Sequence, residues 1–86
     1  MQLVLFTSAF CEPCMQTRAV LAEVARLLPQ ATITELDVVH DEREAEAAGI
    51  RSTPTVIVRN AAGDDVFRAE GVPTVQQVLV AAAKGL

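Results

Sequence analysis

Cys11 and Cys14 are the residues of this 86-residue chain whose type and spacing are best suited to chemistry. They stand in Cys-Glu-Pro-Cys, after the strand-like apolar run Leu3–Phe6 and at the start of a helical pattern. A Cys-x-x-Cys pair between a strand and a helix can open and close as a disulfide. Backbone N–H groups and the helix dipole favour the thiolate of the first cysteine, and the thiolate is the species that attacks disulfides. The spacing therefore predicts thiol–disulfide exchange.

The positions of the two cysteines predict different roles for them. Residues three apart on a helix lie on the same face, so the two sulfurs can reach each other. Cys11, at the mouth of the helix, is expected to be exposed and to act as the nucleophile. Cys14, within the first turn, is expected to be more covered and to resolve the mixed disulfide by attacking the Cys11 sulfur.

The two residues between the cysteines adjust this couple. Pro13 suits the first turn of a helix, because its missing N–H would have no intrahelical partner there. The carboxylate of Glu12 favours the helix N-terminus but disfavours a thiolate beside it. We therefore interpret Glu12 as a redox-tuning residue and expect a couple that tends to reduce its partners rather than oxidise them.

Hydrophobic periodicity predicts the elements that position this motif. Strands are predicted at 2–7, 32–38, 55–59 and 66–70, and helices at 12–28, between 41 and 49, and from about 74 onward. A helix joins the first two strands, which should be parallel with a right-handed crossover, whereas a tight turn makes the last two antiparallel. The prediction is one α/β domain, residues 1–86, of order β-α-β-α-β-β-α, with a mixed four-stranded sheet and helices on both faces.

Capping signals and an apolar stripe define the predicted helices more closely. Asp41 with Glu44, and Thr74 with Gln77, have the spacing of a capping box, in which the first and fourth residues bond each other's backbone N–H. The apolar face predicted for the first helix comprises Met15, Ala19, Val20, Leu21, Val24, Leu27 and Leu28.

A second group of residues, Gly49–Thr55, lies at the start of the third predicted strand. Pro54 lacks a backbone donor, so it interrupts strand pairing and leaves neighbouring backbone groups free. Thr53 is thus placed to offer main-chain hydrogen bonds to an extended segment of a partner, as in strand addition. From this sequence alone a cis Thr53–Pro54 bond is not expected, because few X–Pro bonds are cis.

Metal binding and a purely structural disulfide are the other roles that a cysteine pair can have. Structural zinc normally takes four nitrogen or sulfur ligands. The chain offers Cys11, Cys14 and His40, so a closed zinc site within one chain is not predicted. A structural disulfide would close a very small loop, where the entropic gain is least. A soft metal or an iron–sulfur cluster shared between two chains remains an alternative.

The composition restricts the classes of partner. The net charge is −4 and no Lys/Arg cluster is present, which argues against nucleic acid or anionic membrane as the partner. The acidic run 41–46 is interpreted as a solvated helix face. We see no targeting segment and no apolar run long enough for a membrane span, so the expected location is the cytoplasm.

These residues resemble the thioredoxin superfamily. The resemblance rests on Ser8–Cys14, on Gly49–Thr55, on Gly71 before the last helix and on the order of elements. It implies a thioredoxin fold with strand order 2-1-3-4 and a cis Pro54 against the cysteine pair. It also implies a rim that receives partner proteins, formed by Phe10, Pro13, Thr53 and Gly71.

Several departures from the family pattern bear on the substrate. Phe10 stands where thioredoxins usually carry tryptophan, and Leu5 stands where they usually place a buried aspartate. Glutaredoxins typically have tyrosine between the cysteines and a basic residue shortly before the first, which helps hold glutathione. This chain has Glu12-Pro13 between them and lacks that basic residue. Protein disulfides are therefore favoured over glutathione mixed disulfides.

The resulting expectation is an enzyme, a thiol–disulfide oxidoreductase that reduces protein disulfides through Cys11 and Cys14. It would need no cofactor beyond that redox-active disulfide and would be a monomer. Its partners would be protein disulfides and an upstream reductant, either a reductase of the thioredoxin reductase kind or glutathione. A glutathione-dependent, glutaredoxin-like protein and a metal- or cluster-binding module are the alternatives.

Overall fold

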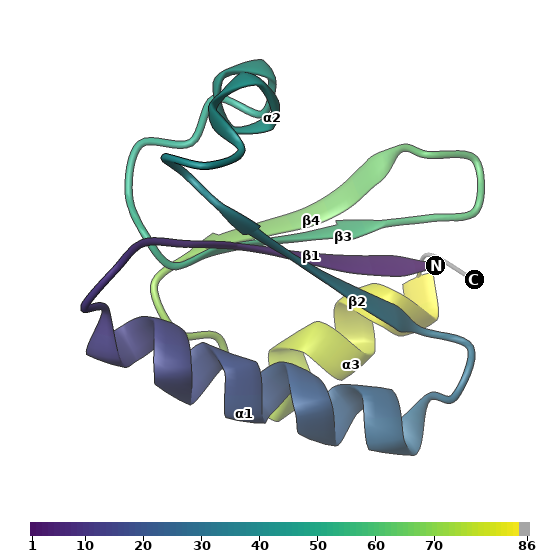
Figure 1. Cartoon of the computed structure of the whole chain (residues 1–86). Helices are drawn as coiled ribbons and strands as arrows, with labels where there is room; N and C mark the ends of the chain where they lie inside the picture. Colours follow the sequence, from purple (N-terminus) through teal and green to yellow (C-terminus); the bar gives the residue numbers. More distant parts are fainter. Residues whose placement is uncertain (85–86) are drawn as a thin grey trace.

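The computed structural model describes residues 1–84, so residues 85 and 86 of the predicted domain lie outside the described residues. The elements in chain order are β1 (Gln2–Thr7), α1 (Glu12–Leu27), β2 (Thr32–Asp37), α2 (Glu42–Ala47), β3 (Thr55–Arg59), β4 (Asp65–Glu70) and α3 (Val75–Lys84), as Figure 1 shows. The predicted order of elements is confirmed, and the predicted boundaries of the first helix and of the second and fourth strands differ by one residue. Among the described residues, no helix combines the length and the apolar character needed to cross a membrane.

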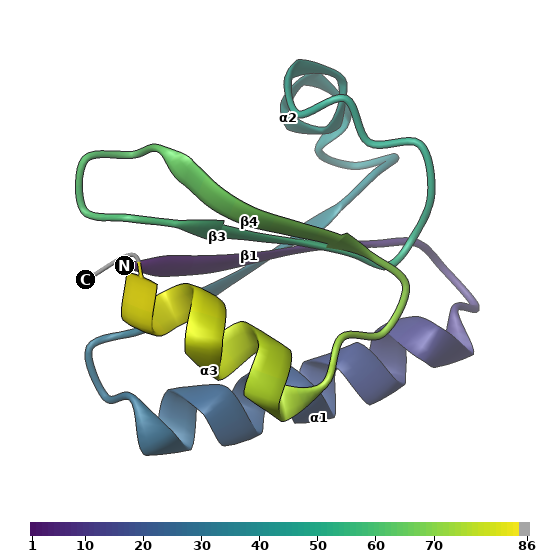
Figure 2. The same ribbon diagram turned by 180° about the vertical axis from the view of Figure 1, so that it is seen from behind.

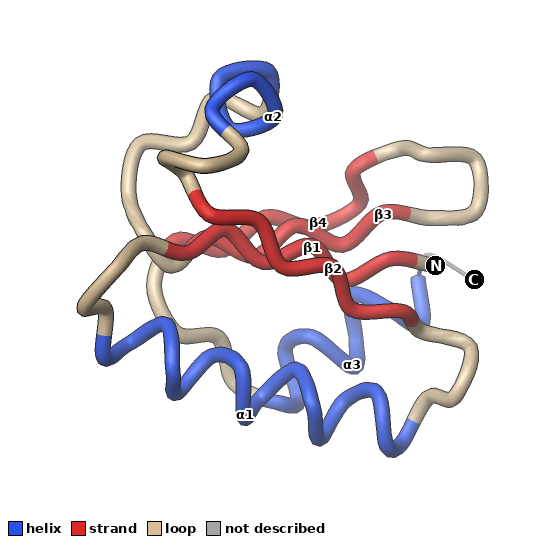
Figure 3. Tube along the Cα trace, viewed as in Figure 1, coloured by secondary structure: helices blue, strands red, loops and turns tan. Residues whose placement is uncertain are grey.

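The strands form one sheet of order β2-β1-β3-β4. β1 is parallel to β2 and antiparallel to β3, and β3 is antiparallel to β4. The mixed sheet and the strand order agree with the sequence prediction. Figure 3 shows the strands as one layer with helices above and below it.

β1 lies inside the sheet and is buried on both faces because its side chains alternate between two cores. Leu3 and Leu5 pack in the core formed with α1 and α3, whereas Val4 and Phe6 pack on the α2 side with Ile57. Figures 1 and 2 show α1 and α3 on one side of the sheet and α2 on the other. The helices therefore cover both faces of the sheet. The C-terminal end of β1 leads through a short loop into α1.

Candidate active site

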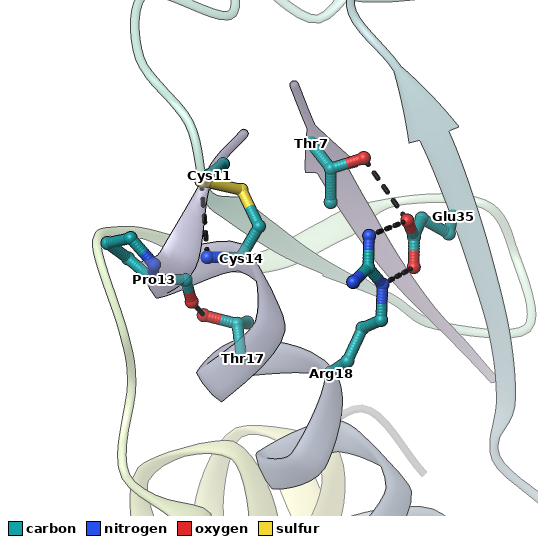
Figure 4. Close-up of polar contacts among 7 residues, drawn as sticks. All are labelled: Thr7, Cys11, Pro13, Cys14, Thr17, Arg18 and Glu35. Atoms are coloured by element: carbon teal, nitrogen blue, oxygen red, sulfur yellow. Dashed lines mark hydrogen bonds and ion pairs between the residues drawn. A yellow bond between two sulfur atoms is a disulfide. The ribbon is translucent and has the colours of Figure 1, made fainter. Parts of the chain in front are cut away.

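The cysteines lie where the chain passes from β1 into α1 (Figure 4). Cys11 is the N-cap of α1, with φ −107° and ψ 99°, and its Sγ accepts the backbone N–H of Cys14 at 3.2 Å. The two residues form a disulfide with a Cα–Cα distance of 5.2 Å. The structure thus contains the oxidised form of the pair, at the N-terminus of a helix of 16 residues.

The two sulfurs differ in exposure, and their surroundings explain why. Cys14 is 1% exposed, whereas Cys11 is partly exposed. Pro13 occupies the first turn of α1, and its carbonyl accepts a hydrogen bond of 2.8 Å from the hydroxyl of the fully buried Thr17. The helix start is therefore held by a local bond, with one sulfur covered and the other accessible.

Phe10 precedes the disulfide in an unusual conformation. Its φ is +56°, the left-handed region that L-residues adopt at a cost of about 1 kcal/mol. Its side chain is fully exposed. An exposed aromatic ring at a strained position beside Cys11 makes no contribution to the core and is available to a partner.

A groove of about 500 Å³ opens beside Cys11. Its lining combines an apolar part next to the sulfur with charged side chains from α1, β2 and the following loop. The lining residues are Thr7, Ser8, Ala9, Phe10, Cys11, Met15, Arg18, Glu35, Asp37 and Asp41. Pro13, Pro54 and Gly71 do not line this groove.

The charged part of the groove contains a network joining three elements (Figure 4). Arg18 of α1 donates two hydrogen bonds, of 2.6 and 2.7 Å, to the carboxylate of Glu35 on β2. The buried Thr7 donates a third to Glu35, at 3.2 Å. The hydrogen bonds from Arg18 hold the pKa of the Glu35 carboxyl below its ordinary value, although partial burial acts in the opposite direction. Glu35 is therefore an ionised, fixed side chain at neutral pH.

The loop before β3 lies beside the cysteine loop, residues 8–11. The Thr53–Pro54 peptide bond is cis, and Pro54 is buried. The hydroxyls of Ser8 and Thr53 share a hydrogen bond of 2.6 Å. The backbone N–H of Gly71 donates to the Pro54 carbonyl at 2.9 Å. Within residues 1–84, neither the backbone N–H nor the carbonyl of Thr53 has a hydrogen-bond partner.

Further bonds fix this loop to β4. Arg51 and Ser52 both donate to the carboxylate of Glu70, at 2.8 and 3.0 Å. The Thr55 hydroxyl donates to the carbonyl of Ser52 at 2.7 Å. The segment that presents Thr53 is thus fixed by side-chain bonds on both sides.

The structure brings some of the residues predicted for the site together and leaves others apart. Thr53 is hydrogen-bonded to Ser8 of the cysteine loop, and its chain neighbour Pro54 accepts the backbone N–H of Gly71. Glu12 and Pro13 are exposed on the first turn of α1. Across residues 1–84, no three His, Cys, Asp or Glu side chains are arranged to hold a metal ion.

Four residues of the site were not predicted from the sequence: Ser8, Thr17, Arg18 and Glu35. A single hydroxyl in a loop carries no periodic signal, and an Arg–Glu pair separated by 17 residues is recognised only once the strand register is known. The parallel register places Glu35 beside Leu5. That register was the missing information.

Comparisons with known proteins agree on one family. A family model described as Thioredoxin matches residues 1–84. The thioredoxin of Methanocaldococcus jannaschii is 34% identical over 83 residues, which are 95% of this chain and 92% of that protein. The thioredoxin of Chlamydia muridarum is 39% identical over 70 residues, which are 81% of this chain and 68% of that protein.

Solved structures share the fold. A single-residue mutant of the thioredoxin from Halobacterium salinarum has a TM-score of 0.86 at 24% identity, with 98% of this chain and 73% of that chain covered. Mitochondrial thioredoxin 3 from Saccharomyces cerevisiae has a TM-score of 0.83 at 16% identity, with 96% and 76% covered. At these identities the likeness concerns the fold alone.

Proposed function

The chain belongs to the thioredoxin family of thiol–disulfide oxidoreductases, and we propose that Cys11 attacks its protein substrates while Cys14 resolves the intermediate. The observation that carries these roles is the difference in burial between the two sulfurs. Cys14 is 1% exposed, so a folded substrate can reach only the sulfur of Cys11.

The proposed reaction starts from the reduced pair. The Cys11 thiolate attacks one sulfur of the substrate disulfide, so that a Cys11–substrate disulfide forms and the other substrate sulfur leaves as a thiolate. The Cys14 sulfur, after losing its proton to solvent, then attacks Cys11 Sγ and displaces the second substrate sulfur. Two electrons have passed to the substrate, and the Cys11–Cys14 disulfide seen in the structure is the product.

The surroundings of Cys11 support its role as the attacking thiolate. The backbone N–H of Cys14 is directed at Cys11 Sγ at 3.2 Å. Hydrogen-bond donors and the dipole at a helix N-terminus stabilise a negative charge on such a sulfur. The exposed carboxylate of Glu12 works against this, and we propose that it moderates the couple.

We place the substrate across Cys11 and the loop of Thr53. The free backbone N–H and carbonyl of Thr53 suit an extended polypeptide that pairs as an added strand. The exposed ring of Phe10, together with Pro13 and Gly71, would complete the rim on either side. Pro54 is buried, and its carbonyl accepts the backbone N–H of Gly71, which holds Gly71 next to the Thr53 loop.

The family implies protein disulfides as substrates and a reductase as the source of electrons. For this chain we propose an upstream reductant of the thioredoxin reductase kind, with glutathione as the second candidate. We further propose that it acts in the cytoplasm as a monomer and that the redox-active disulfide serves without a bound cofactor.

Reduction of insulin by dithiothreitol, followed as turbidity, tests the assignment of the two cysteines. Cys11→Ser should abolish acceleration, because no thiolate can then form the mixed disulfide. Cys14→Ser should also stop turnover, and after it has been reduced and freed of dithiothreitol it should accumulate a covalent adduct with insulin, visible by mass spectrometry. Equal turnover by Cys11→Ser and wild type, or an adduct through Cys14, would reject the assignment.

A further inference from the structure

Ser8 and Thr53 occupy opposite positions just beyond the end of a strand pair. The antiparallel register of β1 and β3 ends at Phe6 and Thr55. Extending that register by two residues sets Ser8 opposite Thr53, with Pro54 in the intervening position. Proline has no N–H to donate, so the backbone ladder stops there. The hydrogen bond between the Ser8 and Thr53 side chains, at 2.6 Å, takes its place.

This bond has no substitute between the two loops. Within residues 1–84, it is the single hydrogen bond that joins the cysteine loop, residues 8–11, to the segment 51–54. The other bonds of that segment run to Thr55, Glu70 and Gly71 and not to the cysteine loop. Without the Ser8 hydroxyl the segment would stay attached to β4 but lose its attachment to the loop that carries Cys11.

The location of the bond connects it with substrate docking. Ser8 lines the groove beside Cys11 and also a second groove, of about 230 Å³, that contains Thr53. Because the bond uses side chains, the backbone groups of Thr53 remain free. A substrate strand paired to Thr53 is thus held at a distance from Cys11 that depends on this hydroxyl pair.

We propose that Ser8 is a positioning residue, which sets the spacing between the Thr53 backbone and Cys11 Sγ for polypeptide substrates. The proposal rests on the proposed function, since it concerns how that site accepts an extended chain. A small disulfide without a peptide backbone makes no use of Thr53, so the effect belongs to protein substrates.

The test compares two substrates, insulin and the small aromatic disulfide dithiobis(nitrobenzoate). Ser8→Ala and Thr53→Val should each lower the ratio of kcat/KM for insulin to that for the small disulfide by about fivefold. This is the change expected when a hydrogen bond of about 1 kcal/mol is lost. The loss should lie in KM rather than kcat. The double variant should be no worse than either single one, because both remove the same bond.

Two further variants separate positioning from stability. Ser8→Thr keeps a hydroxyl and should restore the wild-type ratio. Thr32→Val is the matched control, because the Thr32 hydroxyl donates to the Met1 carbonyl at the opposite end of β1, between β1 and β2 and away from Cys11. Its ratio should equal that of wild type.

Failure of this proposal is distinct from failure of the proposed function. An unaltered ratio in Ser8→Ala, or additive losses in the double variant, would overturn the positioning role even where Cys11→Ser is inactive. Activity retained by Cys11→Ser would instead reject the function itself.

Discussion

Cys11 Sγ accepts the backbone N–H of Cys14 at 3.2 Å, so the attacking sulfur is also the cap of the helix that follows it. A helix N-cap satisfies a donor that would otherwise lack an intrahelical partner. The side chain at position 11 therefore serves both stability and chemistry, and substitutions can separate these two contributions.

Cys11→Ser and Cys11→Ala should be equally inactive but unequally stable. Serine is a good N-cap and alanine is not, and the difference is about 1 kcal/mol. The free energy of unfolding in urea, measured with excess reductant so that no variant carries a disulfide, should be lower for Cys11→Ala by this amount. Equal free energies would mean that the side chain at position 11 does not cap α1.

Phe10→Gly should be more stable than Phe10→Ala. Both substitutions remove the exposed ring, but only glycine adopts a φ of +56° without strain, and the difference should be about 1 kcal/mol. Both variants should reduce insulin more slowly than wild type because the rim has lost its aromatic side chain. Wild-type rates of insulin reduction in both variants would remove Phe10 from the substrate-binding residues. Equal free energies of unfolding in the two variants would show that the backbone of residue 10 is not strained.

Arg18→Gln should raise the pKa of Glu35 toward or above the ordinary glutamate value of about 4.3. In the folded protein that pKa is lowered, first by the hydrogen bonds from Arg18. A lowered carboxyl pKa stabilises the fold above the unfolded-state pKa, and the gain is lost as the pH falls through the folded pKa. As the pH falls from 6 to 3, Arg18→Gln should therefore lose less stability than wild type. This range spans the unfolded glutamate pKa of about 4.3 and the lower pKa of Glu35 in the folded protein.

NMR titration of the Glu35 carboxyl carbon measures this shift directly. Arg26→Gln is the matched control, because it breaks the Arg26–Glu23 pair on the same helix. The Glu35 titration should be the same in Arg26→Gln and in wild type. A Glu35 midpoint that does not move in Arg18→Gln would contradict the assignment of Arg18 as the cause.

The order of elements was predictable because apolar periodicity and capping residues act locally. Thr74 and Gln77 form the predicted capping box, with reciprocal bonds of 3.0 and 2.9 Å. Asp41 is the N-cap of α2 as predicted, but its side chain makes no cap bond and accepts the N–H of Asp37 instead. Spacing identifies a helix start, but it does not say which of two nearby donors a carboxylate will choose.

The buried face of α1 was only partly predictable. Met15 and Leu27, which belong to the predicted apolar stripe, are 63% and 45% exposed. The burial of Cys14 was predicted from its place in the first turn and is confirmed, whereas Thr17 is buried although its hydroxyl keeps it out of a hydrophobic pattern. Thr17 tolerates burial because its hydroxyl donates to the Pro13 carbonyl four residues earlier. Any threonine inside a helix has such an acceptor, so the bond does not mark in the sequence which threonine is buried.

Leu5 occupies the position where thioredoxins usually place a buried aspartate, and here it is fully buried in the core. Its neighbour across the parallel register is Glu35, whose carboxylate is bonded by Arg18. The core at position 5 therefore holds no titratable group. The carboxylate of Glu35 lies in the groove beside Cys11, where Thr7 and Arg18 donate hydrogen bonds to it.

Leu5→Asp should be less stable than Leu5→Asn by an amount that grows with pH. Burial without a partner raises the folded pKa of the new carboxyl above its unfolded value of about 3.9. The two variants should thus be close at pH 4 and diverge above it, by about 3 kcal/mol at pH 8 for an uncompensated buried charge. Urea unfolding at both pH values measures the difference. The same gap at pH 4 and pH 8 would show that position 5 gives an ionised group access to water.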